Sequence, residues 1–283
     1  MSTDNRHDPP GSTPLAPPPA GVPTAYQAWS SQRQTARQLG LHFRRVPPAT
    51  TALVVLIICV HVVSGLEAWQ RGEATLVGSQ LGSRPADVLI RWGAKDAALV
   101  SGGAWWRLLG SALLHGGPMH LGLNMLALFG LGRVCEALYG PTRLLWLFVF
   151  TGITGAGLSQ LGGVALSVGA SGAVFGLMGA GVTFRLRHGA ALPPGVRSML
   201  GRGLAPWIVL NLFIGFSLPG IDNLGHLGGL MGGVLLAMSL GNRVIAGYGG
   251  TPRSQMSLAF AAGGLMGWTL GMMALGRLFG LGG

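Results

Sequence analysis

The chain contains a series of apolar segments, several of them long enough to cross a lipid bilayer, which takes about 20 predominantly apolar residues. These segments lie at residues 50–69, 119–138, 142–161, 169–188, 204–218, 222–240 and 256–281. Only 10% of the 283 residues are charged, whereas soluble domains carry roughly a quarter. We therefore predict an all-α membrane protein with a six-helix transmembrane core and a seventh, C-terminal helix.

The residues before the first apolar segment differ in composition from the rest of the chain. Residues 1–48 are rich in Pro, Ser, Thr and Gly, and such a segment buries too little apolar surface to fold alone. We expect a disordered, Pro-rich cytoplasmic tail over 1–48 and the six-helix core over 49–241. A linker and the seventh transmembrane helix should occupy 242–283.

Basic residues outnumber acidic ones, with 19 Lys and Arg against 8 Asp and Glu. They are scattered between the apolar segments instead of forming one basic patch, so we expect no nucleic-acid binding. Four arginines directly precede the first apolar segment: Arg33, Arg37, Arg44 and Arg45. Because cytoplasmic loops are enriched in Lys and Arg, we place the N-terminus in the cytoplasm. With no organelle-targeting pattern in the sequence, we expect an integral multi-pass protein of a bacterial plasma membrane.

The segment from residue 70 to residue 118 mixes aromatic and basic side chains: Trp92, Trp105 and Trp106 are interleaved with Arg91, Lys95 and Arg107. Such mixtures suit the membrane–water interface, so we predict an interfacial loop on the outer leaflet. A small extramembrane domain is the alternative, but the segment is short for a core of its own. We interpret Lys95, the only lysine, as a compositional bias.

A serine and a histidine in separate apolar segments indicate chemistry. Ser171 lies in the first turn of the fourth predicted helix, where backbone N–H groups are unsatisfied and the helix dipole is positive, which suits an oxyanion. Gly169 and Gly172 flank it and leave room for a substrate backbone. His226 lies near the outer end of the sixth helix, and an ionisable group at membrane depth is a functional-site hypothesis by default. Histidine can take the proton of a serine hydroxyl near neutral pH.

The surroundings of His226 favour a Ser–His dyad over a triad. Asp222 is the only acidic residue near it in sequence and could instead cap the helix. Phe175 lies four residues after Ser171, on the same helix face. It could stack on the imidazole, or it could be an ordinary core aromatic.

A third motif opens the second predicted helix and begins at His115, which we expect to support the site. His120 and Asn124 are one helical turn apart and share a face. Because both can donate hydrogen bonds, they suit an oxyanion hole. The alternatives are a polar pair that bridges helices and a metal site with His115, His120 and His226 as ligands. No carboxylate or thiolate clusters with these histidines, so we expect no metal or other cofactor.

Together these motifs resemble the rhomboid family of intramembrane serine proteases. The matching patterns are Gly-x-Ser-Gly around Ser171, His-x-x-x-Asn at His120 and Asn124, and Gly-His-x-x-Gly-x-x-x-Gly around His226. Trp106 and Arg107 match the family's Trp-Arg pair in the first loop. The resemblance covers roughly residues 49–241, the six-helix core, and a seventh helix after that core also occurs in the family.

The resemblance implies roles residue by residue. Ser171 corresponds to the nucleophile, His226 to the general base, and His120 with Asn124 to the oxyanion-stabilising pair. Phe175 takes the place of the aromatic residue that packs on the catalytic histidine, while Trp106 and Arg107 belong to a structural motif. The implied activity is endopeptidase cleavage of single-span membrane proteins near the outer face of the bilayer, through an acyl-enzyme.

Two other functions remain open from the sequence. A pseudoprotease would use the same fold to bind membrane proteins without cutting them, although such a chain has little reason to keep Ser171 and His226 together. A small transporter would place its polar residues near the midplane, with an internal repeat. We find no such repeat.

Overall fold

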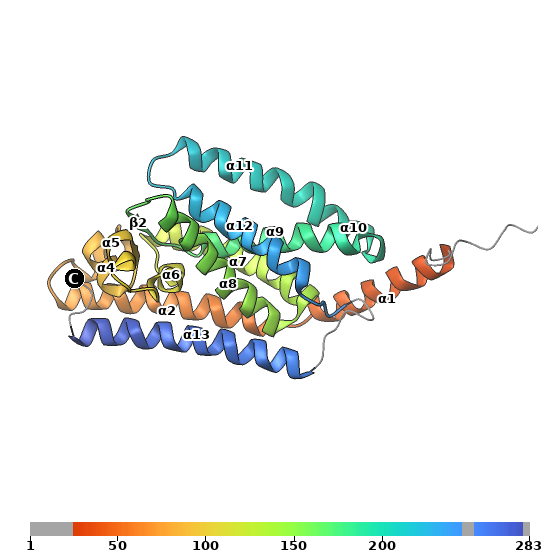
Figure 1. The fold of residues 1–283 in the computed structure, drawn as a ribbon, viewed down its shortest axis with the longest axis horizontal. Helices are drawn as coiled ribbons and strands as arrows, with labels where there is room; N and C mark the ends of the chain where they lie inside the picture. Colours follow the sequence, from red (N-terminus) through yellow and green to blue (C-terminus); the bar gives the residue numbers. More distant parts are fainter. Residues whose placement is uncertain (1–24, 245–251, 280–283) are drawn as a thin grey trace, which may run out of the picture.

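The computed structural model describes residues 25–244 and 252–279, and these form an all-helical bundle (Figure 1). The predicted fold class is therefore confirmed. The long helices are α1 (Ala25–Phe43), α2 (Pro48–Gln70), α7 (Pro118–Tyr139), α8 (Pro141–Leu161), α9 (Ser171–His188), α11 (Leu204–Ser217), α12 (Asn223–Ser239) and α13 (Pro252–Phe279). The strands described are two residues long, β1 (Lys95–Asp96) and β2 (Leu166–Ser167), and pair antiparallel.

Short elements fill the connections between these helices. Between α2 and α7 lie α3 (Leu76–Leu81), α4 (Ala86–Trp92), α5 (Ala97–Ser101), α6 (Arg107–Gly110) and the 3₁₀ turn η1 (Ser111–Leu113). Between α9 and α11 lie η2 (Gly189–Ala191), α10 (Pro194–Ser198) and the π-helical turn η3 (Met199–Gly203). We call the end of the bundle formed by residues 71–117 the loop end.

Four of the described helical stretches are long and apolar enough to span a membrane: α2, α7, α8 and the continuous stretch Pro194–Ser217 that ends with α11. Proline occupies the first turn of α2, α7 and α8, where its missing N–H costs no helical hydrogen bond. The helices α9 and α12 have 18 and 17 residues and are rich in glycine. They lie at the centre of the bundle, and α11 lies at its edge (Figure 1).

Glycine allows α12 to pack directly on the backbones of its neighbours. A Cβ atom on Gly229 would lie 1.9 Å from the carbonyl oxygen of Gly172, and one on Gly233 would lie 2.0 Å from that of Gly176. On the α8 side, a Cβ on Gly228 would lie 2.6 Å from the carbonyl oxygen of Thr154. Small residues thus bring α9 and α12 into backbone contact, as helices in a bilayer require. Gly157 is an exception, since a Cβ there would meet nothing within 4 Å.

The prediction of a disordered tail is wrong for residues 25–43, which form α1; residues 1–24 lie outside the described residues. Leu39 and Thr35 of α1 are buried, and the Gln32 side chain donates a hydrogen bond to the carbonyl oxygen of Ala190, at 2.9 Å. Composition alone missed this helix because the contacts that stabilise it come from residues far away in the sequence.

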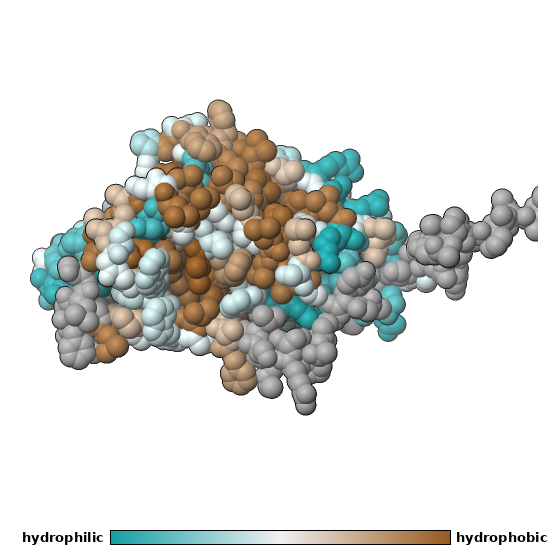
Figure 2. All heavy atoms as spheres, viewed as in Figure 1, coloured by the Kyte–Doolittle hydropathy of each residue, from teal (hydrophilic) through white to brown (hydrophobic). Residues whose placement is uncertain are grey.

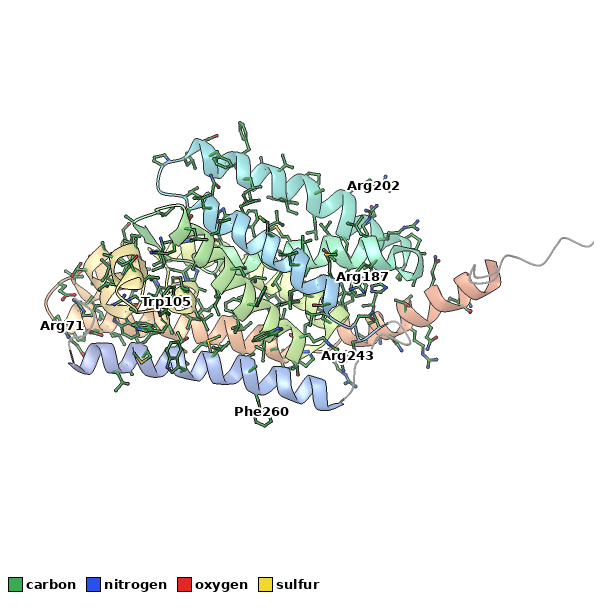
Figure 3. All side chains as sticks on the ribbon, viewed as in Figure 1. Arg71, Trp105, Arg187, Arg202, Arg243 and Phe260 are labelled. Carbon is green, nitrogen blue, oxygen red and sulfur yellow. The ribbon has the colours of Figure 1, made fainter. Side chains whose placement is uncertain are left out.

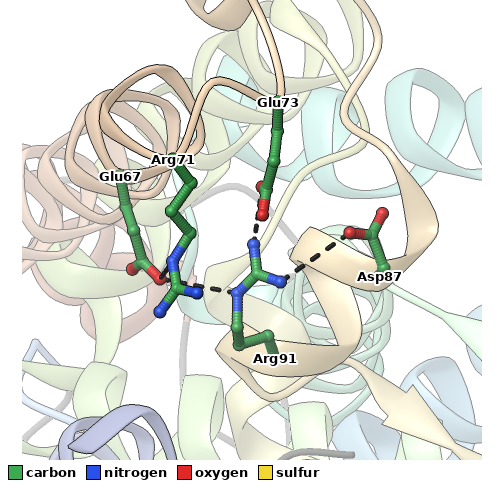
Figure 4. Close-up of polar contacts among 5 residues, drawn as sticks. All are labelled: Glu67, Arg71, Glu73, Asp87 and Arg91. Carbon is green, nitrogen blue, oxygen red and sulfur yellow. Dashed lines mark hydrogen bonds and ion pairs between the residues drawn. The ribbon is translucent and has the colours of Figure 1, made fainter.

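Side chains of the loop end are more buried than expected for an interfacial loop. Trp92 and Trp106 are buried, and of the three tryptophans only Trp105 is exposed, at 62%. An ion-pair network ties this region to α2 (Figure 4). Arg91 of α4 lies 2.7 Å from Glu73, 3.4 Å from Glu67 and 3.7 Å from Asp87, and Glu67 also pairs with Arg71.

Hydrophilic residues gather at the two ends of the bundle, and hydrophobic residues cover most of the surface between them (Figure 2). Figure 3 shows Arg71 at the loop end, with Arg187, Arg202 and Arg243 toward the opposite end. Phe260 of α13 points away from the bundle in the same view and is 72% exposed. An apolar belt between two polar ends is the surface that a bilayer requires.

Candidate active site

Ser171 is the first residue of α9, and the turn before it requires glycine. Gly169 has φ +125°, a conformation that L side chains rarely adopt. A Cβ atom there would also lie 2.7 Å from Nε2 of His120. The Gly169 N–H donates to the carbonyl oxygen of Ser111 at 2.9 Å, which anchors the turn to the loop end. These constraints place the Ser171 hydroxyl at a helix N-terminus.

His226 lies in the first turns of α12 and faces Ser171. Its Nε2 atom is 2.9 Å from the Ser171 Oγ atom, within hydrogen-bonding distance. The helix begins at Asn223, and the Asp222 carboxylate caps it by accepting a 2.8 Å hydrogen bond from the Gly225 N–H. The second ring nitrogen of His226, Nδ1, is buried and has no hydrogen-bond partner among the described residues. Asp222 therefore acts as a helix cap.

Phe175 stacks on His226. The two ring centroids are 4.4 Å apart and the planes are 12° from parallel. Ser171 and Phe175 are one turn apart on α9, so one helix face supplies both a hydroxyl and a flat support for the imidazole. Phe175 is also a buried member of the hydrophobic core, so the structure contains both features that the sequence suggested.

The motif at the start of α7 lies beside the Ser171 turn. The rings of His115 and His120 meet edge to face, with centroids 5.0 Å apart. His115 Nε2 accepts a 3.3 Å hydrogen bond from the Ala170 N–H, so it bears on the residue before Ser171. Burial lowers the pKa of His115 to about 3, and the nearby His120 and His61 act in the same direction. His115 is therefore neutral at physiological pH, as an acceptor must be.

Asn124 is oriented differently from His120. Its side-chain amide donates a 2.9 Å hydrogen bond to the carbonyl oxygen of His120, back along its own helix. The structure thus brings His120 to the Gly169–Ser171 turn, while the Asn124 amide is occupied within α7. Metal ligation by His115, His120 and His226 finds no support, since the described residues contain no group of three His, Cys, Asp or Glu side chains placed for a metal ion.

Trp106 and Arg107 organise the loop end and do not reach the Ser171–His226 pair. Arg107 is fully buried, and its guanidinium donates to the carbonyl oxygens of Ile90 and Ala94 at 2.6 and 3.1 Å. It also lies 4.8 Å from the centroid of the Trp106 ring.

Gly172, the other expected neighbour of the serine, packs against α12, where a Cβ would lie 3.2 Å from the carbonyl oxygen of Gly225.

Two features close to the site in the fold were missed from the sequence. The carbonyl oxygen of Ser111 fixes the Gly169 turn, and nothing in the local sequence around Ser111 signals that contact. Lys95 is fully buried beside β2, just ahead of the same turn. For Lys95, the available signal was that it is the only lysine beside many arginines. Its rarity alone, however, indicates a compositional bias.

Comparison with known proteins agrees with this architecture. The family profile of the rhomboid domain matches residues 102–243, half of the chain. The chain is 40% identical over 160 residues to rhomboid protease GluP of Bacillus subtilis, covering 56% of this chain and 31% of that protein. It is 32% identical over 184 residues to rhomboid protease AarA of Providencia stuartii, covering 57% of this chain and 64% of that protein.

A plant relative, RHOMBOID-like protein 5 of Arabidopsis thaliana, is 38% identical over 163 residues, which cover 56% of this chain and 52% of that protein. The chain thus spans about one third to two thirds of the length of these relatives. The matched residues include the α7 motif, the turn before Ser171, and His226. This chain is therefore a member of the rhomboid family.

Proposed function

We propose that this protein is an intramembrane serine endopeptidase that uses Ser171 and His226 as a catalytic dyad. The observation that carries the proposal is the 2.9 Å distance between the Ser171 Oγ and His226 Nε2 atoms. A nucleophile within hydrogen-bonding reach of a base is the arrangement that covalent catalysis needs. Relatives named rhomboid proteases support the same assignment.

The dyad would work in two steps. His226 Nε2 takes the hydroxyl proton as Ser171 Oγ attacks the scissile carbonyl, and it then gives that proton to the leaving amine, which produces an acyl-enzyme. Water, deprotonated by the same Nε2, releases the acyl group and restores the serine. Nδ1 keeps its proton throughout, so the imidazole becomes positively charged in both transition states. Phe175 holds the ring plane during these transfers.

The negative charge that develops on the carbonyl oxygen needs donors fixed in advance. The N-terminus of α9 supplies backbone N–H groups around Ser171, and His120 lies against the Gly169 turn beside it. Asn124 could join these donors only by giving up its hydrogen bond to the His120 carbonyl oxygen. We therefore propose His120 as the principal side-chain donor and Asn124 as the second.

The substrate and its orientation follow from where the dyad lies in the fold. Ser171 and His226 both lie near helix starts that face the loop end. With the N-terminus in the cytoplasm of a bacterial plasma membrane, the loop end faces outward. The substrates would be single-span membrane proteins, cleaved near the outer face by a core over residues 49–241. Residues 242–283 would add a linker and a seventh transmembrane helix.

Hydrolysis of a model single-span substrate in liposomes tests the proposal. Wild type and Ser239→Ala, which alters the last residue of α12, 13 residues after His226, should both cleave it. Ser171→Ala and His226→Ala, if folded, should not. Equal cleavage by wild type and Ser171→Ala would refute the assignment, and no cleavage by wild type with several substrates would favour a pseudoprotease.

A further inference from the structure

Lys95 is the only lysine of the chain, and its side chain is fully buried. It lies in β1, opposite Ser167 of β2. Its Nζ atom donates a hydrogen bond to the carbonyl oxygen of Val164, in the connection between α8 and β2. A buried ammonium group is costly unless acceptors and opposite charge compensate for its lost hydration. The identity of those compensating groups indicates what Lys95 does.

The nearest opposite charges belong to Asp222 and Asp96. Burial lowers the pKa of Lys95, and the carboxylates of Asp222 and then Asp96 act in the opposite direction. Asp96 uses its Oδ1 to cap α5, accepting from the Leu99 N–H at 3.0 Å. Asp222 uses Oδ1 to cap α12, while its Oδ2 is buried without a hydrogen-bond partner among the described residues. Asp222 therefore has an acceptor left for a cation.

Asp222 and the segment that contacts Lys95 line one cavity at the loop end. A cavity of about 440 Å³ is lined by Val164, Leu166, Asp222 and Leu224, among others. Val164, whose carbonyl oxygen accepts from Lys95, thus shares a cavity with the Asp222 carboxylate. Nearby, a Cβ on Gly162 would lie 2.0 Å from Leu224 Cδ1, so this connection packs tightly on the start of α12.

Each group is connected to one member of the proposed dyad, Lys95 through the pairing of β1 with β2 and Asp222 through α12. β2 is followed by the Gly169 turn and Ser171, and Asp222 begins α12 one turn before His226, whose N–H donates to the Asp222 carbonyl oxygen at 3.1 Å. We propose that Lys95 and Asp222 form a charge pair through a bridging water that holds the start of α12 and His226 against the segment leading to Ser171. Lys95 is then a positioning residue, an inference that rests on the proposed protease function.

The first experiment needs no protease activity. Because the chain has one lysine, protein labelled with ¹⁵N-lysine has a single lysine side-chain signal, and its titration can be followed by NMR in detergent. Asn caps helices as well as Asp does, so Asp222→Asn removes the charge and keeps the cap. The titration midpoint of Lys95 should fall in Asp222→Asn because the protonated amine loses a stabilising carboxylate.

Asp87→Asn is the matched control, since Asp87 lies in the same region with a carboxylate side chain that is 65% exposed. It should leave the Lys95 midpoint unchanged. Identical midpoints in wild type and Asp222→Asn would overturn the charge pair.

The second experiment measures kcat and KM for Lys95→Met, Asp222→Asn and the double variant. Misplacement of a catalytic group by about 1 Å can cost roughly a hundredfold in rate, so a partial displacement of His226 should lower kcat roughly tenfold. KM should stay within about twofold because Lys95 is fully buried and cannot touch substrate. The double variant should lose no more than the worse single variant. Arg71→Met, which removes a half-exposed cation of the same end, should keep wild-type kcat.

The outcomes separate this inference from the proposed function. If wild type shows no Ser171-dependent hydrolysis, the protease assignment fails, while the lysine titration still decides whether the charge pair exists. If the titration shows coupling but kcat is unchanged in both single variants, the positioning role is wrong. Losses that multiply in the double variant would also contradict it. If Lys95→Met does not fold, Asp222→Asn provides both readouts.

Discussion

The ring of Phe175 lies parallel to the imidazole of His226, with 4.4 Å between their centroids. The same imidazole is 2.9 Å from the Ser171 hydroxyl. Because Ser171 and Phe175 share one face of α9, the helix that carries the proposed nucleophile also sets the plane of the proposed base. The backbone contact of α9 with α12 at Gly229 and Gly233 keeps the two helices at that separation.

Replacing Phe175 with Ala should lower kcat by about three- to tenfold, since stacked aromatic pairs contribute about 0.5–1.5 kcal/mol beyond their buried area. The imidazole would lose the surface that holds its plane. Steady-state hydrolysis of the model substrate measures the effect. Phe184→Leu is the control on the same helix, because Phe184 packs on Tyr139 with centroids 5.3 Å apart. It should lower thermal stability and leave kcat near wild type; equal kcat losses in both variants would argue against a specific role for Phe175.

Replacing His120 with Ala should reduce kcat by about 10²–10³-fold with little change in KM, the range found when one oxyanion donor is removed. The matched control is His61→Leu, which alters a buried histidine of α2 whose ring nitrogens have no partner among the described residues. That variant should retain activity. If His120→Ala kept wild-type kcat, the backbone N–H groups of α9 would be sufficient for the oxyanion and our assignment of His120 would be wrong.

Gly229→Ala should destabilise the protein strongly, because the added Cβ would lie 1.9 Å from the Gly172 carbonyl oxygen and force α9 and α12 apart. We expect a loss above about 2 kcal/mol, as for overpacked cores, together with loss of activity. Thermal unfolding in detergent provides the measurement. Gly157→Ala is the control within α8, where a Cβ meets nothing within 4 Å. Alanine favours a helix by up to about 1 kcal/mol over glycine, so this control should be neutral or stabilising, and a similar loss in both variants would contradict the packing argument.

Glu136→Gln should lower the melting temperature because the Glu136 carboxylate holds the first turn of α2. It accepts from the backbone N–H groups of Ala49 and Thr50 at 3.2 and 2.8 Å and from the Thr50 hydroxyl at 2.7 Å. An amide can accept with one oxygen only, so a buried donor loses its partner, at a cost of about 1–3 kcal/mol. Glu73→Gln at the more exposed network of Figure 4 should cost less than about 1 kcal/mol. Equal melting temperatures for wild type and Glu136→Gln would contradict this account.

The sequence predicted the helices best where the signal is local. The segment expected at 142–161 is observed as Pro141–Leu161, because an apolar run bounded by glycine and opened by proline specifies both ends. The sequence did not predict α1, because the contacts that stabilise this helix are distant. Leu39 of α1 is buried, and the Gln32 side chain donates to the carbonyl oxygen of Ala190, 158 residues away. Composition cannot register such a contact, so the whole tail was predicted as disordered.

The same contrast between local signals and distant contacts holds at the site. The sequence could nominate Ser171 from its place at a predicted helix start, His226 as an ionisable group at membrane depth, and Phe175 from its spacing to Ser171, and their roles stay predictions. The side chain of Lys95 donates to a carbonyl oxygen 69 residues away, and the charge pair that we propose joins it to Asp222, still farther along the chain. The side-chain orientation of Asn124, which donates to its own helix, is a rotamer choice that spacing does not determine.

The most direct test of the central claim is covalent trapping of the nucleophile. Wild-type protein in detergent would be treated with a fluorophosphonate, which reacts with activated serines, and the modified peptide would be mapped by mass spectrometry. The account predicts one adduct, on Ser171, that is lost when His226 is replaced by Ala in a folded variant. An adduct on a different serine, or equal labelling of Ser171 without His226, would contradict the proposed dyad.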